Sequence, residues 1–338
     1  MQTVLLPGTA RETTRLGFGC SSIMGALSRR DSLRLLDCAC DHGIRHFDAA
    51  PMYGYGEAES CLGDLLQRHP ADLTITTKYG ISPAKRSTFL RLGRRLAGPV
   101  VKRLPALKHR LAKAANAAAT YRQAAPAWTA GEAKASLERS LSALRATRID
   151  LWLLHEATAE DLTDPSLLQF LEDQVNNGTI GAFGIGSAAE KVPALAARHP
   201  HFCRVLQHEW SVFNPTIPPG DSFRIYHRAL TPDFRTLHAG IRQNQSLCKR
   251  WSQATGHDLA DSAALARLML KASLVANPDS IVLFSSKSPA HIQSNTELAR
   301  DFTLDASARQ LHHLVQSEGA ELLSTHSVSG TRLATGKP

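Results

Sequence analysis

Short apolar runs alternate with longer amphipathic stretches along most of the chain. The apolar runs have the length and the β-branched content of buried strands, and eight of them stand at Thr14–Cys20, Ile44–Ala50, Leu73–Lys78, Arg148–Glu156, Thr179–Ser187, Cys203–Trp210, Phe223–Tyr226 and Ser280–Ser286. The intervening pattern predicts helices at Asp31–His42, Glu57–Arg68, Gly131–Leu144, Pro165–Asn177, Ala189–Arg198, Leu237–Ala254, His257–Ala272 and Pro289–Arg300. Strands that alternate with helices form parallel sheets, and eight such units fit a closed (β/α)8 TIM barrel.

An open, doubly wound sheet is the structural competitor. Such folds often carry a G-x-G-x-x-G turn after the first strand, whereas this strand continues as LGFGCSS. We therefore expect one barrel domain over residues 1–323, with an N-terminal extension and a partly helical insertion at 84–128 after the third strand. The Ser-, Thr- and Gly-rich segment 324–338 is expected to be a mobile tail.

Composition narrows the class of protein. With 43% hydrophobic residues in 338, the chain can build a packed core, which excludes global disorder. The six cysteines contain no C-x-x-C pair, which disfavours a disulfide scaffold or a zinc ribbon. The 15 histidines are dispersed, so no metal site is predicted. The N-terminus lacks a signal-peptide core and no apolar run is long enough for a membrane span, so we expect a cytoplasmic protein without a membrane partner.

Polar side chains stand at the ends of three successive predicted strands. Asp48 ends the second strand with Tyr53 five residues on, Lys78 ends the third, and His155 ends the fourth. Each residue alone is explained by capping, packing or solvation. In a barrel, however, the carboxyl ends of the strands carry the chemistry. An ammonium beside a phenol stabilises the phenolate, a carboxylate holds the ammonium, and an imidazole orients a carbonyl oxygen. This set suits protonation of a carbonyl oxygen while a hydride reaches the carbon.

At these residues the sequence resembles the aldo-keto reductases. The resemblance is carried by GIRHFDAAPMYGYGEAESCLGDLL, TTKYG and RIDLWLLHE, and it extends from about Leu16 to Asn295. It implies the (β/α)8 barrel and a catalytic tetrad of Asp48, Tyr53, Lys78 and His155. Tyr53 would be the general acid in reduction and the base in oxidation, with NADP or NAD as the hydride carrier. A small-molecule carbonyl compound would be the substrate.

The resemblance also implies cofactor contacts at the later strands. Ser187, in GIGS, stands where the family has a carboxamide-binding asparagine, and Gln207, in VLQHEW, matches its glutamine. Tyr226, in FRIYHRAL, stands at the aromatic position that stacks on the nicotinamide, followed by His227 and Arg228, which replace Ser-Pro. The segment FSSKSPAHIQSN resembles the site for the adenosine phosphate, with Ser286, Lys287, His291 and Asn295 as candidates. The basic character there favours NADP, with NAD as the alternative.

The net charge of +9 is concentrated in the insertion. Eleven Lys and Arg and no acidic residue lie between Ala84 and Arg122, and the rest of the chain is nearly neutral. Three interpretations stay open. The insertion is a lid that favours cofactor phosphates or an anionic substrate, or it docks an acidic protein, such as a carrier with a tethered substrate, or a subunit partner, or it is a solvated loop without a specific role. Nucleic acid is disfavoured because few aromatic residues accompany the charges.

Two other functions stay open beside the reductase. The altered cofactor motifs suit a catalytically weak, nucleotide-binding regulatory or partner subunit built on the same barrel. Tyr53 and Lys78 could also perform a redox-neutral elimination or isomerisation. Nucleotide binding and turnover distinguish these alternatives.

Overall fold

Eight parallel strands close into a barrel in the computed structural model of the chain. The structure describes residues 1–25, 27–69, 72–82, 126–215, 220–230 and 233–327. The barrel strands are β3 (Leu16–Gly19), β4 (His46–Asp48), β5 (Thr74–Tyr79), β6 (Ile149–His155), β7 (Ile180–Gly186), β8 (Val205–Glu209), β9 (Phe223–His227) and β10 (Ser280–Phe284). They are ordered β10-β3-β4-β5-β6-β7-β8-β9, so the predicted (β/α)8 barrel is confirmed and the open sheet is excluded.

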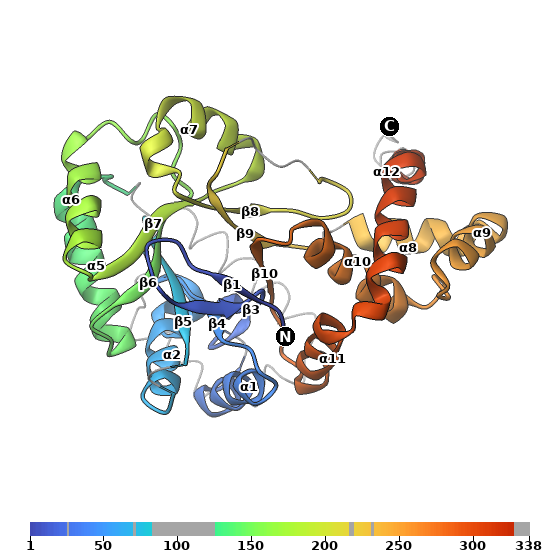
Figure 1. The fold of residues 1–338 in the computed structure, drawn as a ribbon, viewed down its shortest axis with the longest axis horizontal. Helices are drawn as coiled ribbons and strands as arrows, with labels where there is room; N and C mark the ends of the chain where they lie inside the picture. The colour runs from blue at the N-terminus through green and yellow to red at the C-terminus, as the bar shows by residue number, and fades with distance from the viewer. Residues whose placement is uncertain (26, 70–71, 83–125, 216–219, 231–232, 328–338) are drawn as a thin grey trace, which may run out of the picture.

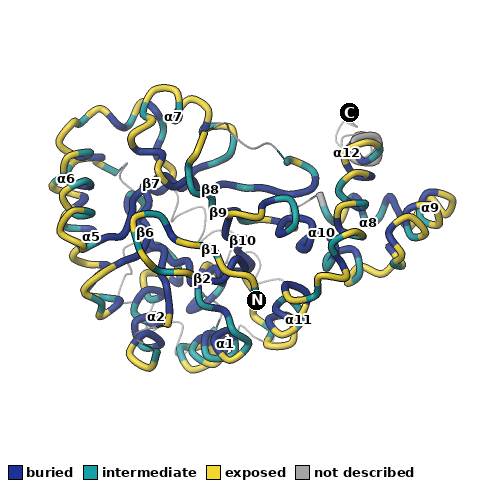
Figure 2. Tube along the Cα trace, in the orientation of Figure 1, coloured by how far each residue is buried: buried dark blue, intermediate teal, exposed yellow. Residues whose placement is uncertain are grey.

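Helices surround the barrel and cover its outer face (Figure 1). Their bounds are α1 (Arg29–Asp41), α2 (Ala58–Leu66), α5 (Ala130–Leu144), α6 (Pro165–Asn176), α7 (Val192–Arg198), α8 (Asp233–Gln243), α9 (Gln245–Thr255), α10 (Ser262–Ala276), α11 (Pro289–Arg300) and α12 (Asp305–Ser327). Short 3-10 turns are η1 (Cys20–Ser22), η2 (Tyr53–Gly56), η3 (Ala189–Lys191), η4 (Pro200–Phe202) and η5 (Phe302–Leu304). The barrel strands are largely buried, and the exposed residues lie on the outer faces of the helices, in the loops and on the N-terminal hairpin (Figure 2).

Side-chain caps explain where several helices begin. Ser28, Thr129 and Asp164 each accept a hydrogen bond from a first-turn amide of the helix that follows. The predicted single helix Leu237–Ala254 is wrong, because Asn244 caps a new helix and separates α8 from α9. Together with α12, these two helices extend from one side of the barrel (Figure 1).

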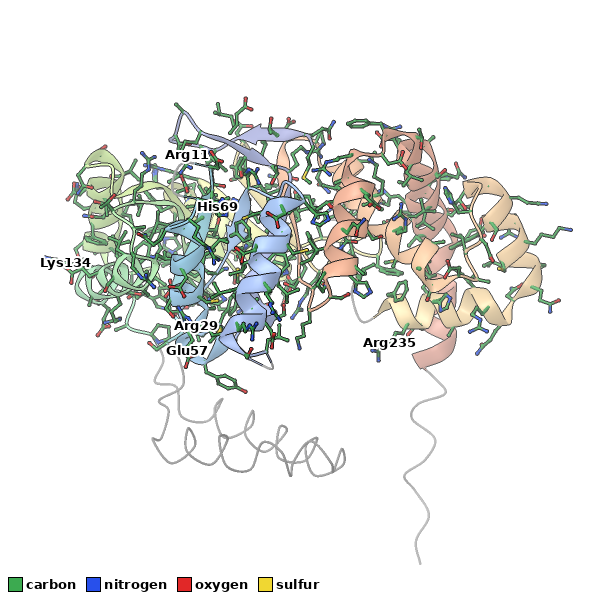
Figure 3. All side chains as sticks on the ribbon, turned by 90° about the horizontal axis from the view of Figure 1, so that it is seen from below. Arg11, Arg29, Glu57, His69, Lys134 and Arg235 are labelled. Carbon is green, nitrogen blue, oxygen red and sulfur yellow. The ribbon has the colours of Figure 1, made fainter. Side chains whose placement is uncertain are left out.

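An N-terminal hairpin closes the end of the barrel where the strands begin. Strands β1 (Thr3–Leu5) and β2 (Glu12–Thr14) pair antiparallel, and Leu6 packs among the apolar side chains inside the barrel. Arg11 donates to Asp150 Oδ1 at 2.7 Å, and Asp150 Oδ2 accepts from the amide of Ile75 at 2.8 Å. Figure 3 shows Arg11 at this end and Arg29 and Glu57 at the opposite end. The hairpin therefore leaves the carboxyl ends of the strands for chemistry.

The insertion leaves β5 at the carboxyl end of the barrel and returns beside it. Of the predicted insertion at 84–128, residues 126–128 are described and the remainder lies outside the described residues, as do 328–338 of the predicted tail. Trp128 packs edge-on against Tyr79, with ring centroids 5.3 Å apart, and Tyr79 stacks on Trp152 at 5.6 Å. The hydroxyl of Tyr79 donates to the carbonyl of Ala127. This aromatic stack holds residues 127 and 128, where the chain returns to the barrel, against Tyr79, the residue that follows Lys78.

Candidate active site

Lys78 lies at the centre of the carboxyl end of the barrel, with its side chain 1% exposed. Its ammonium donates to Asp48 Oδ1 at 2.7 Å, to Asp48 Oδ2 at 2.8 Å and to the carbonyl oxygen of Ala49 at 2.9 Å. Asp48 also accepts from Gln207 Nε2 at 2.7 Å. A buried ion pair is tolerated when its remaining hydrogen-bonding capacity is satisfied. These contacts therefore hold the ammonium in one position.

Tyr53 and His155 complete the cluster. Tyr53 begins η2, directly after the loop that follows β4, and its ring centroid lies 5.1 Å from Lys78 Nζ. The Tyr53 and His155 rings meet edge to face at 6.1 Å, with an interplanar angle of 89°. His155 is the last residue of β6 and is 9% exposed, and its Nδ1 has no hydrogen-bond partner among the described residues. The structure thus brings together the four residues predicted from three strand ends.

The electrostatics differ from the sequence-based argument at one point. Burial raises the pKa of Tyr53, and although Lys78 lowers it by its charge and hydrogen bonding, the net pKa stays above its usual value. Burial lowers the pKa of the Lys78 ammonium, but Asp48 and Tyr53 outweigh burial and raise it. The charge of Lys78 lowers the pKa of Tyr53, as expected, but it does not bring that pKa below the usual value of a phenol. The phenol is therefore protonated, and the lysine charged, at neutral pH.

Two histidines of the site are neutral, His155 within the tetrad and His227 beside it. Burial and the positive charge of Lys78 lower the pKa of His155 to about 3. Burial lowers the pKa of His227 to about 4, although the carboxylates of Glu209 and Asp48 oppose the shift. Both rings can donate or accept a hydrogen bond without carrying a charge. A neutral His155 beside Tyr53 can donate to a carbonyl oxygen.

For any carbonyl reduction in which Tyr53 gives the proton, these pKa directions predict how the rate depends on pH. Tyr53 can donate a proton only while it is protonated, which holds at every pH below its raised pKa. With the pKa of His155 near 3, this histidine does not titrate near neutrality. We expect kcat for reduction to stay constant between about pH 6 and 8.5 and to fall only at more alkaline pH. An acidic limb near pH 6.5 in the kcat profile would contradict this expectation.

Strand register decides which cofactor candidates face the tetrad. Residues 207 and 209 of β8 pair with 225 and 227 of β9, and Gln207 points to Asp48. His227 therefore shares the inner face. Tyr226 lies on the outer face, 2% exposed, and packs edge to face against His208 at 5.1 Å. The structure places His227, and not Tyr226, beside the tetrad, so a nicotinamide contact of Tyr226 has no support from its position.

Ser187 and Arg228 are held by local contacts. Ser187 Oγ donates to the carbonyl of Ala157 at 3.2 Å, and its amide donates to the carbonyl of Gln207 at 3.0 Å. Arg228, in a left-handed conformation with φ of 60°, pairs with Glu209 Oε1 at 3.2 Å. Glu209 Oε2 accepts from the amide of Ala189 at 3.2 Å. The carboxylate of Glu209 thus joins the loops that follow β7 and β9.

Glu209 is not among the site residues that the sequence predicted. It stands two residues after Gln207, so the alternation of a strand places it on the same face. That spacing could have identified it as a residue of the site.

Of the four candidates for the adenosine phosphate, Ser286, Lys287 and His291 lie at the start of α11, and Asn295 lies further along the helix. Ser286 Oγ accepts from the amide of Ser288 at 3.1 Å, and Ser286 is buried. Lys287 and His291 are exposed and Asn295 is half-buried. Within the described chain, Ser288 makes no side-chain hydrogen bond that caps α11. The first amides of the helix and two basic side chains therefore share one place, which suits an anion.

Among the described residues, no group of three or more His, Cys, Asp or Glu is arranged to hold a metal ion. None of the helices that the structure describes is both long and apolar enough to cross a membrane.

Comparison with known proteins identifies the family. The sequence model of the aldo/keto reductase family matches residues 15–219. The chain belongs to this family. A curated relative, pyridoxal 4-dehydrogenase of Microbacterium luteolum, is 45% identical over 75 residues, which are 21% of this chain and 22% of that protein. D-threo-aldose 1-dehydrogenase of a Pseudomonas species is 31% identical over 195 residues, 54% of this chain and 53% of that protein. The chain thus spans about half the length of these relatives or less.

Solved structures match along nearly the whole chain. A glycerol dehydrogenase from Gluconobacter oxydans has a TM-score of 0.65 at 17% identity and covers 94% of this chain and 96% of its own. An aldo-keto reductase from Klebsiella pneumoniae in complex with NADPH has a TM-score of 0.58 at 17% identity, with 92% and 95% covered. At this identity the likeness establishes the barrel fold.

Proposed function

We propose that this protein is an NAD(P)H-dependent oxidoreductase that interconverts a carbonyl compound and an alcohol by hydride transfer, with Tyr53 as general acid and base. The observation that carries the proposal is the position of Lys78 Nζ, which is fixed by Asp48 and lies 5.1 Å from the Tyr53 ring centroid. Membership of the aldo/keto reductase family supports the same chemistry.

Each residue of the tetrad has a defined task in reduction. Tyr53 gives its hydroxyl proton to the substrate oxygen, so the tyrosine O–H bond breaks and the alcohol O–H bond forms. The charge of Lys78 stabilises the phenolate that remains, and Asp48 keeps that charge in place. Neutral His155 donates a hydrogen bond to the substrate oxygen and orients it. In oxidation, the phenolate of Tyr53 accepts the proton.

The residues present fit a nicotinamide nucleotide. The buried Nδ1 of His155 is unpaired among the described residues, and the start of α11 lacks a side-chain cap there. Gln207 and Ser187 would hold the carboxamide, with His227 at the position facing the ring, and Arg228 would meet the pyrophosphate. Ser286, Lys287, His291 and Asn295 would hold the adenosine phosphate, and their charge favours NADP over NAD. When bound, the nicotinamide supplies or accepts the hydride.

The substrate is proposed to be a small carbonyl compound or alcohol. The names of the curated relatives, a pyridoxal dehydrogenase and an aldose dehydrogenase, support this class. Recognition of an anionic or carrier-bound substrate by the basic insertion, an acidic protein partner there, and a cytoplasmic location stay predictions. So does the extent of the domain, 1–323, although α12 continues to Ser327.

The proposal is tested by mixing the purified protein with NADPH or NADH and a panel of aldehydes. We expect nucleotide binding, seen as fluorescence quenching, and loss of absorbance at about 340 nm when an aldehyde is added. Binding of nucleotide with no turnover on any aldehyde would favour the regulatory subunit. Absence of binding would favour the redox-neutral enzyme.

A further inference from the structure

A polar cavity of about 170 Å³ lies at the end of the barrel opposite the tetrad. Arg15, which lines it, directly precedes β3, and Pro278 stands two residues before β10, so the cavity adjoins the amino ends of these strands. Side chains of α10 and α12 also line it, and the N-terminus lies beside α11 at this place (Figure 1). One water needs about 10–15 Å³ of such space, so the cavity has room for a ligand of several atoms.

Arg15 is buried in the wall of this cavity with one donor unused. It is 6% exposed, and its guanidinium donates to the carbonyls of Leu274 and of Asn277, the latter at 2.9 Å. It also donates to the side-chain oxygen of Gln2. Its Nε has no hydrogen-bond partner among the described residues. Because buried donors are nearly always paired, the N–H at this nitrogen calls for an acceptor in the cavity.

Two further basic side chains of the wall share a single carboxylate. Lys271 is 3% exposed, and its Nζ lies 2.9 Å from Asp305 Oδ1. The pair is an ion pair without the alignment of a hydrogen bond, since this oxygen has no hydrogen-bond partner among the described residues. Arg309 lies 4.0 Å from the other oxygen of Asp305 and is 66% exposed. The cavity is therefore open to solvent at Arg309 and buried at Lys271.

The charges that line the cavity do not balance. Its described wall has one acidic side chain, Asp305, and three basic ones, Arg15, Lys271 and Arg309. Burial lowers the pKa of the Arg15 guanidinium, and the carboxylates of Asp279 and Asp305 oppose this shift without cancelling it. Since an incompletely paired buried charge destabilises the fold, an anion in the cavity would offset the excess.

The unpartnered atoms define the ligand further. Arg15 Nε is a donor and requires an acceptor, whereas Asp305 Oδ1 is an acceptor and requires a donor. The ligand therefore combines negative charge with a proton that it can donate. Hydrogen phosphate has this combination at neutral pH, because it carries two negative charges and keeps one hydroxyl group. Sulfate has the same shape and charge but lacks the proton.

We infer that this cavity is a binding site for hydrogen phosphate. Arg15, Lys271 and Arg309 donate to its oxygen atoms. Its hydroxyl group donates to the carboxylate of Asp305, which therefore selects an anion that carries a proton. The site is separate from the start of α11, because Ala299, which lines the cavity, stands ten residues after Pro289, or about 15 Å along that helix. The inference does not depend on the proposed function.

The test titrates the full chain with phosphate and with sulfate at equal ionic strength, using isothermal titration calorimetry. We expect phosphate to bind about 10- to 100-fold more tightly, because a sulfate oxygen in contact with Asp305 leaves the carboxylate without a donor. Equal affinities, or no saturable binding of phosphate, would overturn the inference. Methyl phosphate, whose dianion has no hydroxyl group, should bind as weakly as sulfate. Binding as tight as that of phosphate would overturn the assignment to the free ion.

Variants place the ion in this cavity. Arg309→Gln should weaken phosphate binding about threefold to tenfold. Lys287→Gln is the matched control, because it removes the same charge from an exposed position at the start of α11 and should leave this affinity within about twofold. Weakening by Lys287→Gln alone would place the ion at α11 and overturn the inference. In Asp305→Asn the preference for phosphate over sulfate should fall to about twofold or less, because an amide can donate to either ion.

Two measurements on the wild type need no variant, which matters if Asp305→Asn unfolds because Lys271 loses its partner. Saturating phosphate should raise the unfolding temperature more than sulfate at the same ionic strength, because a ligand that binds the folded chain stabilises it. An equal rise would count against the site. In crystals grown with phosphate, we expect a tetrahedral ion in contact with Arg15 Nε. Water alone in the cavity would overturn the inference.

Discussion

Tyr53→Phe is expected to lower kcat for carbonyl reduction by about 10²- to 10⁴-fold, the usual contribution of a positioned general acid. The substitution keeps the ring that packs edge-on to His155 and lies near Lys78, and it removes only the hydroxyl. Binding of the nucleotide should therefore stay within a few-fold of the wild type. Steady-state kinetics and fluorescence titration with NADPH measure the two quantities on the same sample.

Tyr79→Phe is the matched control for this experiment. Tyr79 follows Lys78 in β5 and is also buried, but its hydroxyl donates to the carbonyl of Ala127 on the outer side of the strand. Loss of the Tyr79 hydroxyl should lower the free energy of unfolding by about 1 kcal/mol and should leave kcat nearly unchanged. Near-normal turnover in Tyr53→Phe, or an equal loss in Tyr79→Phe, would contradict the role of Tyr53.

Lys78→Met has the second large effect, on both activity and stability. Without the ammonium, the phenolate of Tyr53 loses its stabilising charge, so kcat should fall by orders of magnitude. The carboxylate of Asp48 stays buried with Gln207 as its remaining side-chain partner. An unpaired buried charge typically destabilises a protein by about 3–5 kcal/mol. Urea unfolding monitored by circular dichroism measures this loss.

The double variant Lys78→Met with Asp48→Asn separates the two effects. Removing the unpaired charge should restore much of the stability, because the amide of asparagine is neutral and can still bond Gln207. Turnover should stay as low as in the single variant. Recovery of turnover along with stability would show that Lys78 has only a structural role.

Much of the fold could be predicted from the sequence because the barrel strands are short, apolar and regularly spaced. The structure contains all eight expected strands, because residues that form turns or begin helices flank each strand in the sequence. The hairpin β1–β2 was missed, because three-residue strands such as TVL and ETT give too short an alternation. The cap at Asn244 was missed because the helical pattern continues across it, and only its hydrogen bond to the amide of Leu247 shows the break.

The cluster of four residues could be predicted for a related reason. Asp48, Lys78 and His155 end successive strands, and parallel strands bring their ends to one side of a barrel. The sequence could not show which of residues 226 and 227 points into the barrel, because a change of one residue in the strand register moves each side chain to the other face of the sheet. The direction of the pKa shift of Tyr53 could not be predicted from the sequence either, because it depends on how far burial outweighs the charge of Lys78.

The most direct test of the central claim follows the transferred hydrogen. The protein is incubated with NADPH carrying two deuterium atoms at C4 of the nicotinamide and with benzaldehyde, and the product is examined by NMR. The account predicts benzyl alcohol with one deuterium on the carbinol carbon, formed by the wild type and almost absent with Tyr53→Phe. Alcohol without deuterium on that carbon, or equal deuterium transfer by both proteins, would contradict it.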